Sequence, residues 1–146
     1  MQNGETFFAD APDPLASDND LVIATACTLI SVGTERMLVD FGKSSYLSKA
    51  KQHPDKVKMV LDKVSTDGLL TTIDAVRSKL AQPIPLGYCN VGIVTECGGR
   101  VTDFRKGDRV VSNGSHADVV KVSKNLCALV PDSVDDETAS FTVLAS

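Results

Sequence analysis

The chain has 146 residues, of which 42% are hydrophobic, 23% are charged and 5% are aromatic, and its formal net charge is −4. This length suits one globular domain with a real core, and the acidic balance leaves neither a basic stripe for phosphates nor enough aromatic platforms for stacked bases, so we expect no nucleic-acid partner. No basic segment followed by an apolar run opens the chain, and no apolar run approaches the roughly 20 residues that span a bilayer. We therefore expect a cytoplasmic protein without a membrane partner.

The first elements predicted along the chain are two strands, over residues 5–9 and 21–28. The run DAPDPLASDND between them is rich in proline, aspartate and asparagine, which are typical of a loop.

A helical insert is predicted over residues 34–81, because the hydrophobic period changes there. Apolar residues recur at helical spacing in three groups: Met37, Leu38 and Phe41; Val57, Val60, Leu61 and Val64; Leu69, Ile73, Val76 and Leu80. Pro54 suits the first turn of a helix, and Asp67-Gly68 suits the junction between two helices. We expect two or three short helices.

The second half returns to strands, each bounded by glycine, asparagine or aspartate. The predicted strands cover residues 91–96, 109–112, 117–122 and 126–130. Asn113-Gly114 is the strongest hairpin signal in the chain, because both residue types tolerate the positive φ values of a type I′ turn. The predicted fold class is therefore mainly β with a helical insert (α+β).

Neither the cysteines nor the histidines have the spacing of a metal site. The four cysteines form no Cys-x-x-Cys pair, and Cys27 and Cys127 lie in apolar runs, which favours reduced thiols that pack as small hydrophobic groups. His53 and His116 have no cysteine or carboxylate at zinc-finger-like spacing. We expect this chain to build no metal site by itself.

Five runs occur in an order that resembles a known family. They are ISVGTE (30–35), PLGYCNVGIV (85–94), VTDFRKGDRVV (101–111), LVPD (129–132) and ETA (137–139). Together they resemble the catalytic, GroES-like domain of medium-chain dehydrogenase/reductases, the zinc-type alcohol dehydrogenase superfamily. The resemblance covers nearly the whole chain, 1–146, and implies a GroES-like, partly open β-barrel.

Two of these runs resemble a bacterial subgroup in which such a dehydrogenase half is joined to a sugar-type oxidoreductase domain: SVGTERM (31–37) and LGYCNVG (86–92). Members of the superfamily bind NAD or NADP in a Rossmann domain that follows the catalytic one, with a glycine-rich turn at a helix N-terminus. No Gly-x-Gly-x-x-Gly occurs here, and residues 141–146 resemble the start of the lead-in helix. We expect an N-terminal catalytic-domain fragment that lacks its Rossmann partner and is inactive alone.

The chain departs from the superfamily at the zinc ligands. By the resemblance, Val32 takes the position of the ligating cysteine, Tyr88-Cys89 that of the usual His-Glu pair, and Leu144 falls near the third ligand. An aliphatic side chain cannot ligate zinc, so we predict a zinc-independent oxidoreductase acting on an alcohol or carbonyl substrate. NAD versus NADP stays open, as does a homo-oligomer.

Tyr88 is the leading catalytic candidate. Without zinc, hydrogen-bond donors must stabilise the oxyanion, and the phenol of Tyr88, with Asn90 or Thr34 nearby, can donate to a substrate oxygen. The alternative is that Tyr88 packs beneath the nicotinamide site with its hydroxyl bonded to backbone. Thr34 and Glu35 are candidates for cofactor contact, but they suit helix capping equally well. Cys89 is interpreted as an inert thiol.

Two non-enzymatic interpretations stay open. The barrel could be a binding or scaffold module without chemistry, because fold does not determine function. The amphipathic helices after Pro54 could instead dock a partner, although packing on the barrel explains their apolar faces more simply.

Overall fold

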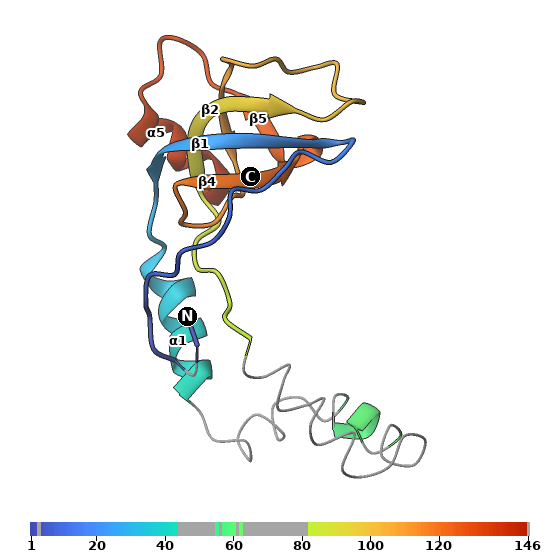
Figure 1. Ribbon diagram of the computed structural model, residues 1–146. Coiled ribbons are helices and arrows are strands. Elements are labelled where there is room, and N and C mark those ends of the chain that lie inside the picture. The colour runs from blue at the N-terminus through green and yellow to red at the C-terminus, as the bar shows by residue number, and fades with distance from the viewer. Residues whose placement is uncertain (3, 44–54, 56, 61, 63–81, 146) are drawn as a thin grey trace. The chain divides into compact units, whose positions relative to one another are not determined.

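The computed structural model describes residues 1–145 apart from 3, 44–54, 56, 61 and 63–81 (Figure 1). The chain divides into two compact units: Met1–Phe8 with Arg36–Ile84, and Ala9–Glu35 with Pro85–Ser146. We call the second of these the sheet unit. It carries the five strands of the described part of the chain.

The sheet unit is built on one open antiparallel sheet. Its strands are β1 (Asp20–Thr28), β2 (Asn90–Cys97), β3 (Arg109–Ser112), β4 (Val119–Ser123) and β5 (Cys127–Leu129), in the spatial order β4-β1-β2-β3-β5. Every neighbouring pair is antiparallel. Because β4 and β5 lie at opposite edges, the sheet is not closed, which confirms the predicted GroES-like, partly open β fold.

Valine and isoleucine side chains bury both faces of the sheet, as expected of β-branched residues on a pleated surface. Val110 and Val111 are neighbours on β3 and point to opposite faces, and each belongs to a different apolar cluster. One cluster joins β1, β2, β3 and β4 and packs against Phe104. The other packs against Ala139 of helix α5 (Asp136–Ser140) and Val143 of helix α6 (Thr142–Ala145). The two faces therefore have separate cores.

The helical insert begins with helix α1 (Val32–Lys43), two residues before the predicted start. Its first turn carries Glu35 and its last turn Lys43, each favourable for the helix dipole. Residues 55, 57–60 and 62 are also helical. The rest of the predicted insert lies outside the described residues.

Three local predictions differ from the structure. Residues 6–9 form no strand, and Glu5 makes only an isolated bridge to Gln2. Phe7 and Phe8 are exposed, so this run has no buried face to hold it in a sheet. The predicted strand 126–130 shortens to β5, because the 3-10 helix η1 (Lys124–Leu126) precedes it.

The Asn113-Gly114 hairpin was the third wrong prediction. β3 pairs with β2 and β5, whereas β4 pairs with β1, so no hairpin joins β3 to β4. Gly114 is not among the described glycines with positive φ. A Cβ on Gly114 would lie 2.8 Å from Val120 Cγ2, so this glycine allows close packing and does not make a tight turn.

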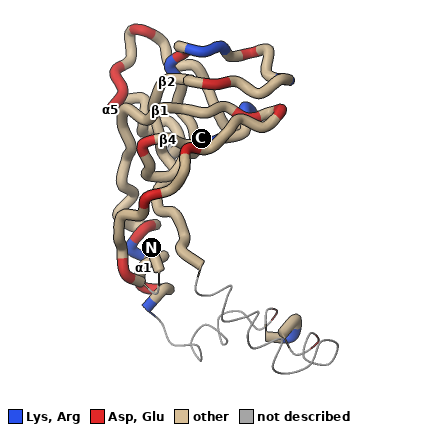
Figure 2. Tube along the Cα trace, in the orientation of Figure 1, with Lys and Arg blue, Asp and Glu red and all other residues tan. Residues whose placement is uncertain are grey.

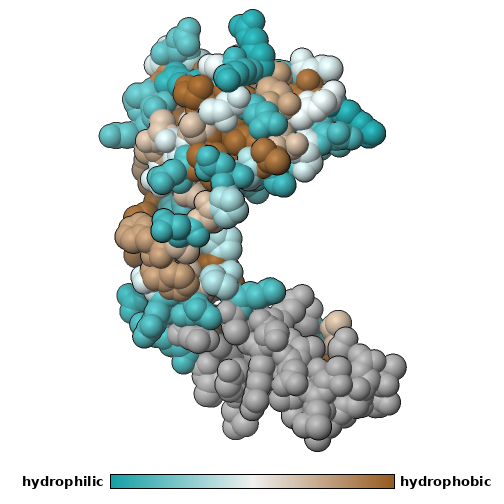
Figure 3. Space-filling view, viewed as in Figure 1, coloured by the Kyte–Doolittle hydropathy of each residue, from teal (hydrophilic) through white to brown (hydrophobic). Residues whose placement is uncertain are grey.

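Charged and apolar groups are interspersed on the surface of the sheet unit. Where basic residues gather, in the loop before β3, Asp103 and Asp108 accompany them (Figure 2). Apolar side chains such as Leu129 and Phe141 are exposed, and Figure 3 shows apolar atoms between polar ones on the face in view. Among the described residues, no helix has the length and apolar character needed to cross a membrane.

Candidate functional site

Three segments of the sheet unit meet at the candidate site. They are the first turn of α1 with the residue before it (31–35), the segment that leads into β2 (85–89), and the loop between β3 and β4 (113–118). Each segment contributes polar side chains, and the contacts between them join positions far apart in the sequence.

Tyr88 and Thr34 lie side by side, as the sequence analysis expected. The Tyr88 hydroxyl is 3.4 Å from Thr34 Oγ1, and Ser31 Oγ is 3.3 Å from the same Thr34 oxygen. Both distances are long for hydrogen bonds between hydroxyl groups, whose usual separation is about 2.7–2.8 Å. All three side chains are partly exposed. The hydroxyl groups are therefore only weakly paired and accessible to a further oxygen atom.

Glu35 makes a long-range contact that no local sequence pattern predicts. This carboxylate is buried, and its Oε1 accepts hydrogen bonds from the Ser31 backbone N–H (3.0 Å) and from His116 Nε2 (3.2 Å). The bond from Ser31 is the helix-capping role expected of a first-turn carboxylate. The sequence gives His116 no role, because its partner lies 81 positions away and no local spacing links the two.

The backbone around His116 is tied to the Tyr88 segment. The His116 N–H donates to the Leu86 carbonyl at 2.7 Å. Gly87 has a φ of +87°, and a Cβ at this position would lie 2.7 Å from the His116 ring atoms. A glycine is therefore needed at position 87 both for its conformation and for the close approach of the imidazole.

Asn90 lies beneath the site and is fully buried. Its Nδ2 donates to Thr25 Oγ1 (2.8 Å), and the Thr25 hydroxyl donates to the Ala117 carbonyl (2.6 Å). The Asn90 Oδ1 atom is buried without a partner among the described residues. Asn90 thus braces the loop that holds His116, and its predicted contact with substrate stays a prediction.

Cys89 is also fully buried. Burial, and to a smaller extent the charge of Glu35, raises the pKa of the Cys89 thiol. Since the thiolate is the reactive form, this environment suits the predicted inert thiol.

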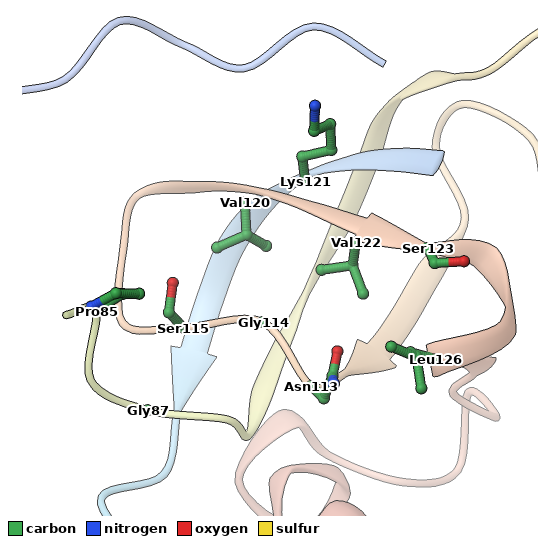
Figure 4. Close-up of a pocket in the computed structure, with 10 residues that line it drawn as sticks. All are labelled: Pro85, Gly87, Asn113, Gly114, Ser115, Val120, Lys121, Val122, Ser123 and Leu126. Carbon is green, nitrogen blue, oxygen red and sulfur yellow. The ribbon is translucent and has the colours of Figure 1, made fainter. Parts of the chain in front are cut away.

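A cavity of about 360 Å³ lies beside these segments (Figure 4). Its lining comprises Pro85, Gly87, Asn113, Gly114, Ser115, Val120, Lys121, Val122, Ser123 and Leu126. Val120 and Val122 of β4 face the loop of residues 113–115 across it, while the Lys121 ammonium points away. Gly87 and Ser115 belong to the segments of the candidate site, so the cavity borders it from the β4 side.

The donor groups at the zinc-ligand positions of the superfamily do not suit zinc. Val32 is aliphatic and exposed at the start of α1, and the positions that the resemblance assigns to the His-Glu pair hold the Tyr88 phenol and the buried Cys89 thiol. Within the described part of the chain, no group of three or more His, Cys, Asp or Glu side chains could hold a metal ion.

Comparison with known proteins identifies the family. The sequence model of the alcohol dehydrogenase GroES-like domain matches residues 57–134, which is more than half of the chain. The chain belongs to the alcohol dehydrogenase GroES-like domain family. This GroES-like domain is part of the medium-chain dehydrogenase/reductase superfamily that the sequence motifs indicated.

Solved structures of longer proteins share the fold of this GroES-like domain. Escherichia coli quinone oxidoreductase complexed with NADPH matches 92% of the chain with a TM-score of 0.57 and 16% identity, over 31% of its own length. A mycobacterial quinone oxidoreductase matches 98% of the chain (TM-score 0.60, 22% identity), over 35% of its length. An alcohol dehydrogenase superfamily protein from Novosphingobium aromaticivorans matches 95% (TM-score 0.60, 18% identity), over 34% of its length.

One curated relative is a much larger protein. The highly reducing polyketide synthase cla2 of Cladosporium cladosporioides is 36% identical over 70 residues, which is 46% of this chain and 3% of the synthase. The GroES-like domain thus spans about a third of the length of the solved structures and a small part of the synthase.

Proposed function

We propose that this GroES-like domain is the substrate-binding half of a zinc-independent, NAD(P)-dependent oxidoreductase that acts on an alcohol or carbonyl compound. The observation that carries the proposal is the weakly paired, accessible Tyr88 and Thr34 hydroxyl groups, 3.4 Å apart, where zinc-type relatives hold a metal ligand. The likeness to quinone oxidoreductases, one of them complexed with NADPH, supports a nicotinamide cofactor. A Rossmann domain outside the 146 residues would bind it, and the chain alone would be inactive.

The hydroxyl groups can replace the Lewis acid that zinc provides in related enzymes. When bound, a nicotinamide cofactor would supply the hydride to the carbonyl carbon. Negative charge then develops on the carbonyl oxygen, and groups already oriented towards that oxygen stabilise it. Tyr88 and Thr34 can both point a hydroxyl at one oxygen, because their mutual contact is long and weak.

A proton must follow the hydride to complete the alcohol. The Tyr88 phenol would donate it to the oxyanion. The phenolate would then recover a proton from solvent, because the Tyr88 side chain is partly exposed. The carbonyl group, one hydride and one proton together give one alcohol.

Tyr88→Phe in the whole gene product tests the donor role. Loss of one positioned acid should lower kcat/KM for carbonyl reduction by roughly 10²- to 10⁴-fold. The matched control is Tyr46→Phe, which changes the only other tyrosine of the chain. An unchanged kcat/KM in Tyr88→Phe would exclude Tyr88 as the donor.

The 146-residue chain should by itself show no nicotinamide-dependent turnover, because the cofactor would bind mainly outside it. The measurement is NAD(P)H oxidation by the purified chain against a panel of quinones, aldehydes and ketones. Turnover comparable to that of the whole gene product would refute the assignment of the cofactor site to another domain.

A further inference from the structure

We propose that His116 is a positioning residue that holds the Tyr88 hydroxyl opposite Thr34, and that Glu35 is its anchor. This inference rests on the proposed function, since it concerns the same hydroxyl pair. His116 is neither a superfamily zinc position nor a candidate from the sequence, and it touches both segments that carry the hydroxyl groups.

His116 is bonded to the first turn of helix α1. His116 Nε2 donates to Glu35 Oε1 at 3.2 Å, and Glu35 is the residue next to Thr34. The same carboxylate oxygen accepts the Ser31 N–H, so the bond is made to the rigid first turn of the helix. Only about a quarter of the His116 side chain and a tenth of the Glu35 side chain are exposed, at 25% and 11%, which shields the pair from water.

His116 also contacts the segment that carries Tyr88. The His116 N–H donates to the Leu86 carbonyl, and the imidazole packs directly on Gly87, the residue before Tyr88. Gly87 has a positive φ, so its conformation sets the direction in which Tyr88 leaves the backbone. The His116 side chain thus sets the distance between Glu35, next to Thr34, and Gly87, next to Tyr88.

The loop that carries His116 is itself held by hydrogen bonds to β1. The Ala117 carbonyl accepts from the Thr25 hydroxyl, which in turn accepts from the buried Asn90 amide. The Thr25 N–H also donates to the Asp118 carbonyl at 2.9 Å. The residues that follow His116 are thus bonded to β1. These bonds fix the position of the imidazole independently of α1.

His116→Phe is the informative variant, measured in the whole gene product. The phenyl ring keeps the packing on Gly87 but cannot donate to Glu35. We expect kcat to fall roughly ten- to hundredfold, with KM changed much less, because a displaced acid lowers the rate of proton donation more than substrate binding. His116→Gln, whose amide can still donate to Glu35, should recover part of the lost kcat. Arg100→Gln, at an exposed pair with Asp18, is the control and should leave kcat unchanged.

The double variant Tyr88→Phe with His116→Phe separates positioning from general stability. If His116 acts through the Tyr88 hydroxyl, adding His116→Phe to Tyr88→Phe should lower kcat no further. Equal losses in both backgrounds would overturn the proposal, and so would full kcat in His116→Phe.

The proposed function fails separately, through Tyr88→Phe alone, if that variant keeps full kcat/KM. Should His116→Phe not fold, Glu35→Met removes the acceptor and leaves the imidazole in place. It should give the same fall in kcat and the same lack of a further loss beside Tyr88→Phe, and an additive loss would count against the proposal.

Discussion

Gly87 is subject to two constraints, a positive φ and close contact with the His116 ring. Substitutions at Gly107 and Gly99 allow the two effects to be measured separately. Gly87→Ala should lower the free energy of unfolding by about 2–4 kcal/mol. The left-handed conformation is unfavourable for alanine, and its Cβ would lie 2.7 Å from the His116 ring. Gly107 also has a positive φ, at +94°, but nothing lies within 4 Å of its Cβ position. Urea unfolding of both variants is the measurement.

The difference between the two alanine variants measures the contact with His116. Gly107→Ala should cost about 1–2 kcal/mol, from the backbone alone. Gly99→Ala is the neutral control, since Gly99 has neither a positive φ nor a close neighbour. Equal losses at Gly87 and Gly107 would mean that the imidazole moves aside without cost.

The sequence offered as site candidates only residues whose signal is local. Thr34 and Glu35 begin the predicted helical insert, and Tyr88 stands between two glycines in a family motif. His116 could not be predicted, because its role depends on a fold that brings it to a carboxylate 81 positions away. A histidine in a loop gives no sign of its partner until the strand order is known.

Arg109 ties strand β3 to a loop and to helix α5. At the end of β3 its guanidinium donates to Asp136 Oδ1 (2.9 Å) and to the Pro131 and Val134 carbonyls (both 2.7 Å). Arg109→Lys should lower the free energy of unfolding by about 1–3 kcal/mol, because a single ammonium cannot reach three acceptors in a planar fork. Chemical denaturation checks the loss.

Arg100→Lys is the matched control for this prediction. Arg100 pairs with Asp18 at 3.3 Å, but their side chains are 73% and 65% exposed. Exposed pairs contribute little, so the change should stay within about 0.5 kcal/mol. Equal effects at Arg100 and Arg109 would contradict the role of Arg109 in holding α5.

The hydrophobic pattern predicted the three central strands closely and the others less well, and the hairpin signal was wrong. β3 was predicted residue for residue, and β1 and β2 to within one residue at each end. Asn113-Gly114 had the composition of a hairpin, yet β1 and β2 occupy the places between β3 and β4. The burial of Gly114 against Val120 overrode its turn preference, which a linear pattern cannot reveal.

The stability of the whole chain should fall on both sides of neutral pH. Burial raises the pKa of Cys127 to about 11, and it also raises the pKa values of Cys89 and Cys97. A folded-state pKa above the unfolded one gives stability that is complete below about pH 8.5 and is lost as pH rises through the folded value. The free energy of unfolding should therefore fall between about pH 8.5 and 11.

At acid pH, the free energy of unfolding changes with pH in the opposite direction. Hydrogen bonds from Thr102 and Lys124 lower the pKa of Asp103, and hydrogen bonds from Thr138 lower that of Asp135. Their contribution is present above about pH 4 and is lost as pH falls through the lowered values. Urea titrations across the pH range measure both limbs. Cys127→Ala should flatten the alkaline limb, and a variant curve parallel to the parent would rule out this thiol as its source.

The fold of the whole molecule was predictable because several motifs in order carry more information than any one of them. The GroES-like, mainly β class was predicted from five runs, and three of them (85–94, 101–111 and 129–132) lie within residues 57–134, which the family model matches. The two apolar clusters, one for each face, were not predicted, because deciding which valine faces which side requires the register.

The neighbouring positions of β1 and β2 bear on how this family can change length. These central strands pair along most of their length, although the chain returns to β2 only after the whole insert. Closing such a span of about 60 residues costs conformational entropy that grows only with the logarithm of its length, so doubling it would cost only about 0.6 kcal/mol. A longer or shorter insert should therefore change the stability of the sheet unit little, provided that the residues at its two ends, Ser31 to Glu35 and Pro85 to Cys89, are unchanged.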